Sequence, residues 1–220
     1  MTAVLAAISF MQEDFSFEPA HFYRFDEGND AEFYSGQRLV KHLDDEGIEL
    51  LTNFYRQIIH SGGAILDLMS SWISHLPEEL IFDSIVGLGM NAIELNANSR
   101  LDKRALHDLN ADPDLPFQSE SFDVCLIALS VQYLTRPVDV FNEIARVLKP
   151  EGKCIVSFSN RCFPTKAIRV WQTLDDEGHI WLVKKYFEST GLFNFIYKET
   201  LSSGEAHKDP LFAVVAQKQT

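Results

Sequence analysis

The sequence predicts an α/β fold in which one doubly wound, mostly parallel sheet carries helices on both faces. Two observations between His107 and Asn160 point to it. The runs 122–130 and 154–159 are short, apolar and bounded by polar residues, as in strands that are buried on both sides. Between them, residues 138–150 place apolar side chains at helical spacing. A strand, a helix and a strand in this order form a right-handed crossover of a parallel sheet.

The remaining elements continue this alternation along the chain. We expect a helix to begin at Pro77, which two acidic residues follow, and another after Asn91, an N-cap with Glu94 in the capping-box position. Residues 165–189 are predicted to be helical, with a break near Asp175. Five further apolar runs are predicted as strands: 64–68, 82–88, 104–108, 193–201 and 212–218.

The chain before the first strand has a different character. Residues 12–35 are rich in aromatic and acidic residues without a clear period, which indicates an irregular arm with short helices. Residues 37–60 have a helical pattern that Gly47 is expected to divide. We therefore predict an N-terminal arm with helices over residues 1–62 that caps the site, and a single compact core over 63–220.

Composition limits the kinds of partner. The 220 residues carry a net charge of -13 without a basic run, which disfavours nucleic acid and an anionic membrane surface and favours a small-molecule substrate. No segment is long and apolar enough to suggest a membrane span or a convincing signal peptide. Three cysteines without metal spacing, Cys125, Cys154 and Cys162, predict reduced thiols, a cytoplasmic protein and no metal site.

Three motifs in the second half of the chain carry a family resemblance. Residues 115–117 read Leu-Pro-Phe, 121–123 read Ser-Phe-Asp, and 146–152 read RVLKPEG. Together with the strands around them, they resemble the class I S-adenosylmethionine-dependent methyltransferases of the type 11 kind, over residue 64 to the C-terminus. The resemblance implies a Rossmann-like, seven-stranded sheet that ends in an antiparallel hairpin, for which 202–204 have turn composition. It also implies S-adenosylmethionine as cofactor.

A ligand of such a sheet binds beyond the carboxyl ends of the strands, so the loops there are read for chemistry. In the first loop Asp67 matches the family's acidic residue, but the glycines that usually follow are absent. Their places hold Met69, Ser70, Ser71 and Trp72, and Ser74 follows. The serines either offer donors to a ligand carboxylate, with Trp72 as a wall, or satisfy the backbone of the turn.

The second loop contains Leu88, Gly89, Met90 and Asn91, and Gly89 stands where the family has a ribose-binding acid. Asn91 either contacts the ribose or only caps the helix. Residues 87–92 also fit the pattern G-x-G-x-x-A of dinucleotide sites, with a later acidic residue at a suitable spacing. An NAD(P)-dependent oxidoreductase is therefore a rival hypothesis.

The later loops offer the remaining candidates. By resemblance, Asp108 and Leu109 form the pair that holds adenine, and Ala128 lines the cofactor; alternatively, Asp108 caps the following turn. The catalytic candidates are Gln132, Tyr133, His42 and Arg161. Tyr133 is otherwise a core anchor, and Arg161 is either a contact for an anionic substrate group or part of a surface salt bridge.

The arm offers candidates as well. Tyr34, Arg38 and His42 lie four residues apart and would share one face of a helix. Three functions stay open: a methyltransferase with a variant first loop and a small-molecule acceptor, a non-catalytic protein of the same fold that binds a ligand or partner, and the oxidoreductase.

Overall fold

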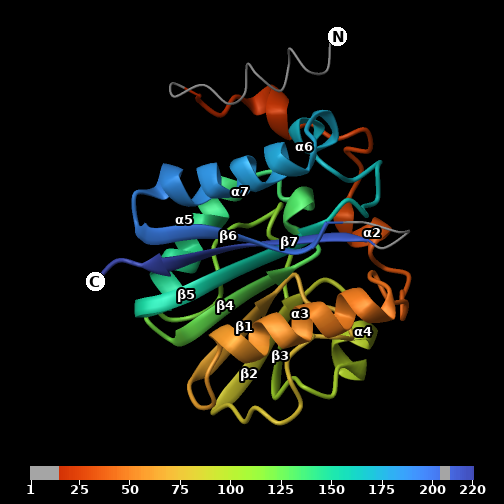
Figure 1. The fold of residues 1–220 in the computed structure, drawn as a ribbon. Coiled ribbons are helices and arrows are strands. Elements are labelled where there is room, and N and C mark those ends of the chain that lie inside the picture. Colours follow the sequence, from red (N-terminus) through yellow and green to blue (C-terminus); the bar gives the residue numbers. More distant parts are fainter. Residues whose placement is uncertain (1–14, 204–208) are drawn as a thin grey trace.

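The computed structural model describes residues 15–203 and 209–220. Its centre is one seven-stranded sheet with the order β3-β2-β1-β4-β5-β7-β6 (Figure 1). The first five strands are parallel, and β7 runs antiparallel between β5 and β6, as predicted. The bounds of the strands are β1 Ala64–Leu68, β2 Ser84–Gly89, β3 Lys103–Leu106, β4 Phe122–Ala128, β5 Leu148–Ser159, β6 Phe193–Ser203 and β7 Pro210–Lys218.

Helices cover both faces of this sheet (Figure 1). On one face, α5 and α7 pack against alternate strand residues such as Leu66 and Cys125; on the other, α3 and α4 pack against Ile65 and Leu126. The strands are therefore buried on both sides, as their apolar runs predicted. The bounds of the helical segments are η1 Pro19–Phe22, α2 Asp30–Phe33, α3 Asp45–Ile58, α4 Ala92–Ala97, η2 Val131–Tyr133, α5 Pro137–Val147, α6 Arg169–Thr173 and α7 Asp176–Thr190.

The helix predicted to begin at Pro77 does not form. Residues 69–83 connect β1 to β2 as irregular chain. Their backbone groups bind side chains of other segments: Arg100 donates to the carbonyl oxygens of Pro77 and Leu80 at 3.1 and 3.0 Å, and Asn98 donates to Ser71. Tertiary hydrogen bonds thus replace the intrahelical ones that the composition suggested.

The helical region predicted over 37–60 is also shorter than expected. Residues 37–44 are not helical, and α3 begins after Asp44, whose carboxylate accepts a bond from the amide of Gly47 at 2.6 Å. Gly47 therefore lies in the first turn and does not divide two helices. Before α3, the chain is held by contacts with other segments, among them a bond from the Trp72 indole to the carbonyl oxygen of Val40.

The C-terminal elements agree with their prediction. Asp175 caps α7 and separates it from α6. The strands β6 and β7 pair as a hairpin, although part of the turn predicted at 202–204 lies outside the described residues. Cys125 and Cys154 face each other on neighbouring strands as buried free thiols, and burial raises the pKa of Cys125. Within the described ranges, the helices are all too short or too polar to cross a membrane.

Candidate functional site

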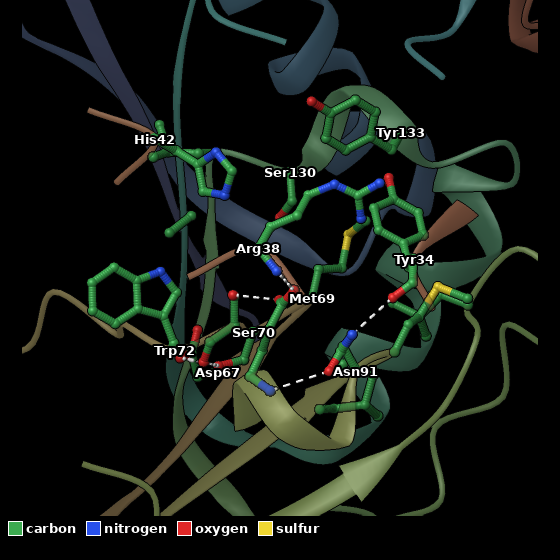
Figure 2. Close-up of a pocket in the computed structure, with 18 of the residues that line it drawn as sticks. Tyr34, Arg38, His42, Asp67, Met69, Ser70, Trp72, Asn91, Ser130 and Tyr133 are labelled. Carbon is green, nitrogen blue, oxygen red and sulfur yellow. Dashed lines mark hydrogen bonds between the residues drawn. The ribbon is translucent and has the colours of Figure 1, made fainter. Parts of the chain in front are cut away.

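A pocket lies beyond the carboxyl ends of β1, β2 and β4, under residues of the N-terminal arm; we call it the ligand pocket (Figure 2). Most of the predicted site residues line it. They are His42, Asp67, Met69, Ser70, Ser71, Trp72, Leu88, Gly89, Met90, Asn91, Asp108, Leu109, Ala128 and Tyr133. Three predicted residues do not: Ser74 is buried behind the first loop, Gln132 is fully buried, and Arg161 is exposed.

The first loop forms a tight turn without glycine. Met69 adopts a φ of 54°, the left-handed conformation that glycine enters most easily. The next amide, that of Ser70, donates to the carbonyl oxygen of Leu88 at 2.8 Å, which ties the loop to the end of β2. The loop therefore keeps a left-handed backbone at the place where the family usually has glycine.

Asp67 is the centre of this loop. Only 2% of the residue is exposed, and its carboxylate accepts bonds from Ser70 Oγ at 2.7 Å and Ser74 Oγ at 2.6 Å. Asn98 holds Ser74 in turn, at 2.8 Å. Burial raises the pKa of Asp67 to about 6, and the two hydroxyls oppose this shift. Among the described residues no cation pairs with this carboxylate, so it suits a cationic group of a ligand.

The second loop shows why an acid is absent at Gly89. A Cβ at this position would lie 2.3 Å from the carbonyl oxygen of Ser70, and one at Gly87 would lie 2.3 Å from the Leu101 side chain. Both glycines of the dinucleotide-like pattern thus have packing roles. A carboxylate reaches the pocket from Glu94 instead, in the first turn of α4.

Glu94 does not complete the capping box that its position suggested. Its Oε1 accepts from the backbone amide of Arg38 and its Oε2 from Ser71 Oγ, both at 2.6 Å. Asn91 caps α4 as predicted, and its Nδ2 donates to the carbonyl oxygen of Tyr34 at 2.9 Å (Figure 2). These bonds join the arm to the first and second loops, and sequence spacing could not reveal them.

In the third loop Asp108 caps the turn and also lines the pocket. Its Oδ1 accepts bonds from the amides of Asn110 at 2.9 Å and Ala111 at 3.3 Å, so it caps the turn. The residue is also half-buried at the pocket wall. Leu109 is 4% exposed and packs into the core while it lines the pocket.

The loops after β4 and β5 give a different result for each of their catalytic candidates. The Tyr133 hydroxyl accepts a bond from the amide of Phe163 at 2.8 Å, and burial raises its pKa to about 12. Gln132 donates to the carbonyl oxygen of Leu129 at 3.0 Å, outside the pocket. Arg161 pairs with Asp209 at 2.8 Å, which is the surface salt bridge considered from the sequence.

The arm contributes residues that sequence reasoning missed as site residues. Asp30 lines the pocket and binds Arg24 at 2.7 Å, Lys166 at 2.9 Å and Asn110 at 2.8 Å. Burial alone would raise the pKa of Asp30, but these three hydrogen bonds hold it below its ordinary value. Because the partners come from distant segments, no local pattern in the sequence could indicate this anchor.

Two histidines face the pocket as well. Burial lowers the pKa of His42 and lowers that of His75 to about 4, so both are neutral at pH 7. Tyr34, Arg38 and His42 do line one pocket, but they lie on irregular chain after α2 and not on one face of a helix. In the part of the chain that the structure describes, His, Cys, Asp and Glu do not gather into a group that could hold a metal ion.

Comparisons with known proteins bear on the family and the fold. Residues 72–156 match a protein family described as a methyltransferase domain. A malonyl-[acyl-carrier protein] O-methyltransferase from Marinomonas sp. (strain MWYL1) is 31% identical over 97 residues, which are 44% of this chain and 35% of that protein. The chain thus spans about a third of the length of this curated relative, and 16% of a bifunctional biotin-biosynthesis relative from Teredinibacter turnerae.

Solved structures share the fold. The PH0226 protein from Pyrococcus horikoshii OT3 superposes with a TM-score of 0.61 at 18% identity, over 86% of this chain and 99% of that one. Phosphoethanolamine N-methyltransferase 2 from Haemonchus contortus, solved in complex with S-adenosyl-L-methionine, gives 0.55 at 15% identity, over 80% and 53%. The match of residues 72–156 to a methyltransferase domain, the curated relative and the sheet order together support the class I S-adenosylmethionine-dependent methyltransferase fold for this chain.

Proposed function

We propose that this protein transfers a methyl group from S-adenosylmethionine to a small-molecule acceptor in the ligand pocket. The observation that supports this most is Asp67, a buried carboxylate at the end of β1 without a cation partner among the described residues. An unpaired buried charge is costly. The ammonium group at the methionine end of the cofactor would supply the missing positive charge.

Other residues of the pocket suit the rest of the cofactor. We assign the ribose hydroxyls to Glu94, because Gly89 has no room for an acidic side chain. We assign adenine to Asp108 and Leu109. In the hydrogen bonds of the described residues Asp108 uses Oδ1, so its second oxygen can accept from the exocyclic amine of adenine.

The proposed mechanism asks the protein mainly for alignment and exclusion of water. When bound, the cofactor supplies a sulfonium methyl group that is already activated. The arm and the loops after β1 and β4 enclose the reacting groups. Tyr133 acts as a wall, since a phenol with a pKa of about 12 is a poor base at neutral pH. Neutral His42 is the proposed proton acceptor, where the acceptor molecule needs one.

Titration calorimetry tests the proposal. We expect S-adenosylhomocysteine, the product form of the cofactor, to bind the wild-type protein, and NAD⁺ not to bind. Asp108→Ala should weaken binding by about tenfold or more, because a charge-assisted hydrogen bond is lost. Asp114→Ala removes an exposed carboxylate of the same region and serves as the control. Failure of the wild type to bind S-adenosylhomocysteine would refute the proposed function.

A ligand-binding protein without transferase activity is the second candidate. The first loop favours it, because it lacks the family's glycines and its Ser70 and Ser74 hydroxyls are both engaged with Asp67. Incubation with S-adenosylmethionine and a small-metabolite extract separates the two functions. Formation of S-adenosylhomocysteine above the extract-free rate supports transfer, whereas tight binding without turnover supports the second candidate.

A further inference from the structure

Arg38 crosses the middle of the ligand pocket (Figure 2). Its backbone amide is fixed by Glu94 at 2.6 Å. Its guanidinium donates to two carbonyl oxygens of the arm, that of Phe33 at 2.8 Å and that of Gly36 at 3.2 Å. These bonds hold the cation in one place inside the pocket before any ligand arrives.

Aromatic rings surround this guanidinium. Its central carbon lies 4.7 Å from the ring centre of Phe33, 5.4 Å from that of Phe163 and 5.8 Å from that of Tyr34. Tyr133 extends the cluster, because its ring stacks on Phe163 with 5.8 Å between centres. Rings stabilise a guanidinium through their faces and leave its edge free for a planar anion.

No carboxylate forms an ion pair with the Arg38 guanidinium within the described residues. Arg24, Arg146 and Arg161 form ion pairs with Asp30, Glu143 and Asp209. Arg100 and Arg104 also bind carbonyl oxygens without an ion pair, but they do not line the pocket. The two carbonyl bonds use two of the five guanidinium N–H groups, so three remain available. The pocket therefore presents a fixed, unneutralised cation.

We propose that Arg38 binds a carboxylate-type group of a pocket ligand, and that this group belongs to the methyl acceptor. The second part rests on the proposed function. The residues assigned to the cofactor follow β1, β2 and β3, whereas the rings around Arg38 come from the arm and from the segment after β5. An acceptor with a carboxylate beside an aromatic or otherwise flat body fits this place. The cofactor's own carboxylate is the other source of the same chemistry.

Two ligand pairs and one variant test the inference. Arg38→Gln removes the charge but keeps amide donors for the two arm carbonyls. Benzoate and its neutral isostere benzamide are titrated into the protein, with and without saturating S-adenosylhomocysteine. S-adenosylhomocysteine is titrated beside 5′-methylthioadenosine, which lacks the amino-acid part. Arg136→Gln is the control, since Arg136 pairs with Asp139 on the surface, outside the pocket.

We expect benzoate, and not benzamide, to bind the wild-type protein that is saturated with S-adenosylhomocysteine. Arg38→Gln should weaken the binding of benzoate by about tenfold or more, as for a lost hydrogen bond to a charged group. Arg136→Gln should match the wild type. If Arg38→Gln instead weakens S-adenosylhomocysteine and spares methylthioadenosine, the anion is the cofactor's and the assignment to the acceptor is overturned. If Arg38→Gln changes the affinity for neither ligand pair, Arg38 is only a structural part of the arm.

Failure of the proposed function has a different signature. In that case the wild type does not bind S-adenosylhomocysteine, while benzoate still binds the ligand-free protein in a manner that depends on Arg38. The two results are read from separate titrations of the same protein.

Discussion

Ser70 and Gly89 are in such close contact that a Cβ on Gly89 would lie 2.3 Å from the Ser70 carbonyl oxygen. In the same contact between the first and second loops, the Ser70 amide donates to the carbonyl oxygen of Leu88 at 2.8 Å. The first loop, which lacks glycine, therefore presses against the second loop, which needs one. The first loop without turn glycines and the second loop without an acidic residue at position 89 therefore belong to the same packing arrangement.

An acidic residue at position 89, where the family has one, should destabilise the folded protein. We expect Gly89→Asp to lower the free energy of unfolding by about 1–3 kcal/mol, because the new side chain must displace the backbone of Ser70. Urea denaturation measures the change. Gly36→Asp is the matched control, since nothing lies within 4 Å of a Cβ at that position. Equal free energies of unfolding of the two variants would mean that the contact between Ser70 and position 89 adapts to the new side chain at little cost.

Met69 offers a test of backbone strain in the first loop. Met69→Gly and Met69→Ala both remove the side chain, but only glycine relieves a φ of 54°. The glycine variant should be the more stable of the two by about 1 kcal/mol in thermal or urea unfolding. At Met90, which lacks a positive φ, the order should reverse and alanine should be the more stable. The same order at both sites would contradict a left-handed Met69.

Asp67 should make the folded protein less stable as the pH rises, which is the opposite of the usual effect of an acidic residue. Burial raises its pKa to about 6, above the value of 3.8 expected in the unfolded chain. The folded protein therefore binds the proton more tightly, and this contribution to stability is complete below pH 3.8 and lost as the pH rises through 6. It amounts to up to about 3 kcal/mol.

Urea unfolding of the wild type and Asp67→Asn from pH 4 to 8 measures this contribution. The wild type should lose stability relative to the variant across that window, whereas an Asp114→Asn control should follow the wild type. Ligand binding should show the opposite trend, because an ammonium group prefers the ionised carboxylate: affinity for S-adenosylhomocysteine should fall below pH 6. A wild-type-to-variant difference that is constant with pH would exclude the raised pKa.

Lys166 should be essential for the attachment of the arm. It is fully buried and binds Asp30 at 2.9 Å and the carbonyl oxygen of Gly28 at 2.8 Å. Lys166→Met should lower the free energy of unfolding by about 3–5 kcal/mol, because buried acceptors lose their cation. Lys149→Met removes a half-exposed pair with Asp123 and should cost about 1 kcal/mol or less. Equal costs would show that the arm is held by other contacts.

Most of the sheet could be predicted from the sequence, because strands buried on both faces leave an uninterrupted apolar run. The run at 64–68 corresponds residue for residue to β1, and 122–130 to β4 within two residues. Helices with a full amphipathic face, such as α5, were equally clear. The predictions that were wrong concern weak local signals: the acidic turn at Pro77 and the glycine at 47, where contacts with distant segments outweigh composition.

The site was predictable where a residue lies at or shortly after the carboxyl end of a strand. Asp67, Asp108 and Tyr133 line the pocket because the carboxyl ends of parallel strands converge there. Arg38 and Glu94 were not recognised in these roles. Glu94 was expected only in a capping box, whereas the structure brings the backbone amide of Arg38 to its carboxylate.

The sequence by itself determined the layers of this protein, the direction of its strands and the edge of the sheet where the pocket lies, since these depend on periodic burial within short segments. Only the tertiary structure decided which charges are satisfied there. Among the residues that the structure describes, Asp67 has no counter-ion, Asp30 is neutralised, and Arg38 is enclosed by rings. Such pairing depends on contacts between segments far apart in the chain, and local patterns contain no information about them.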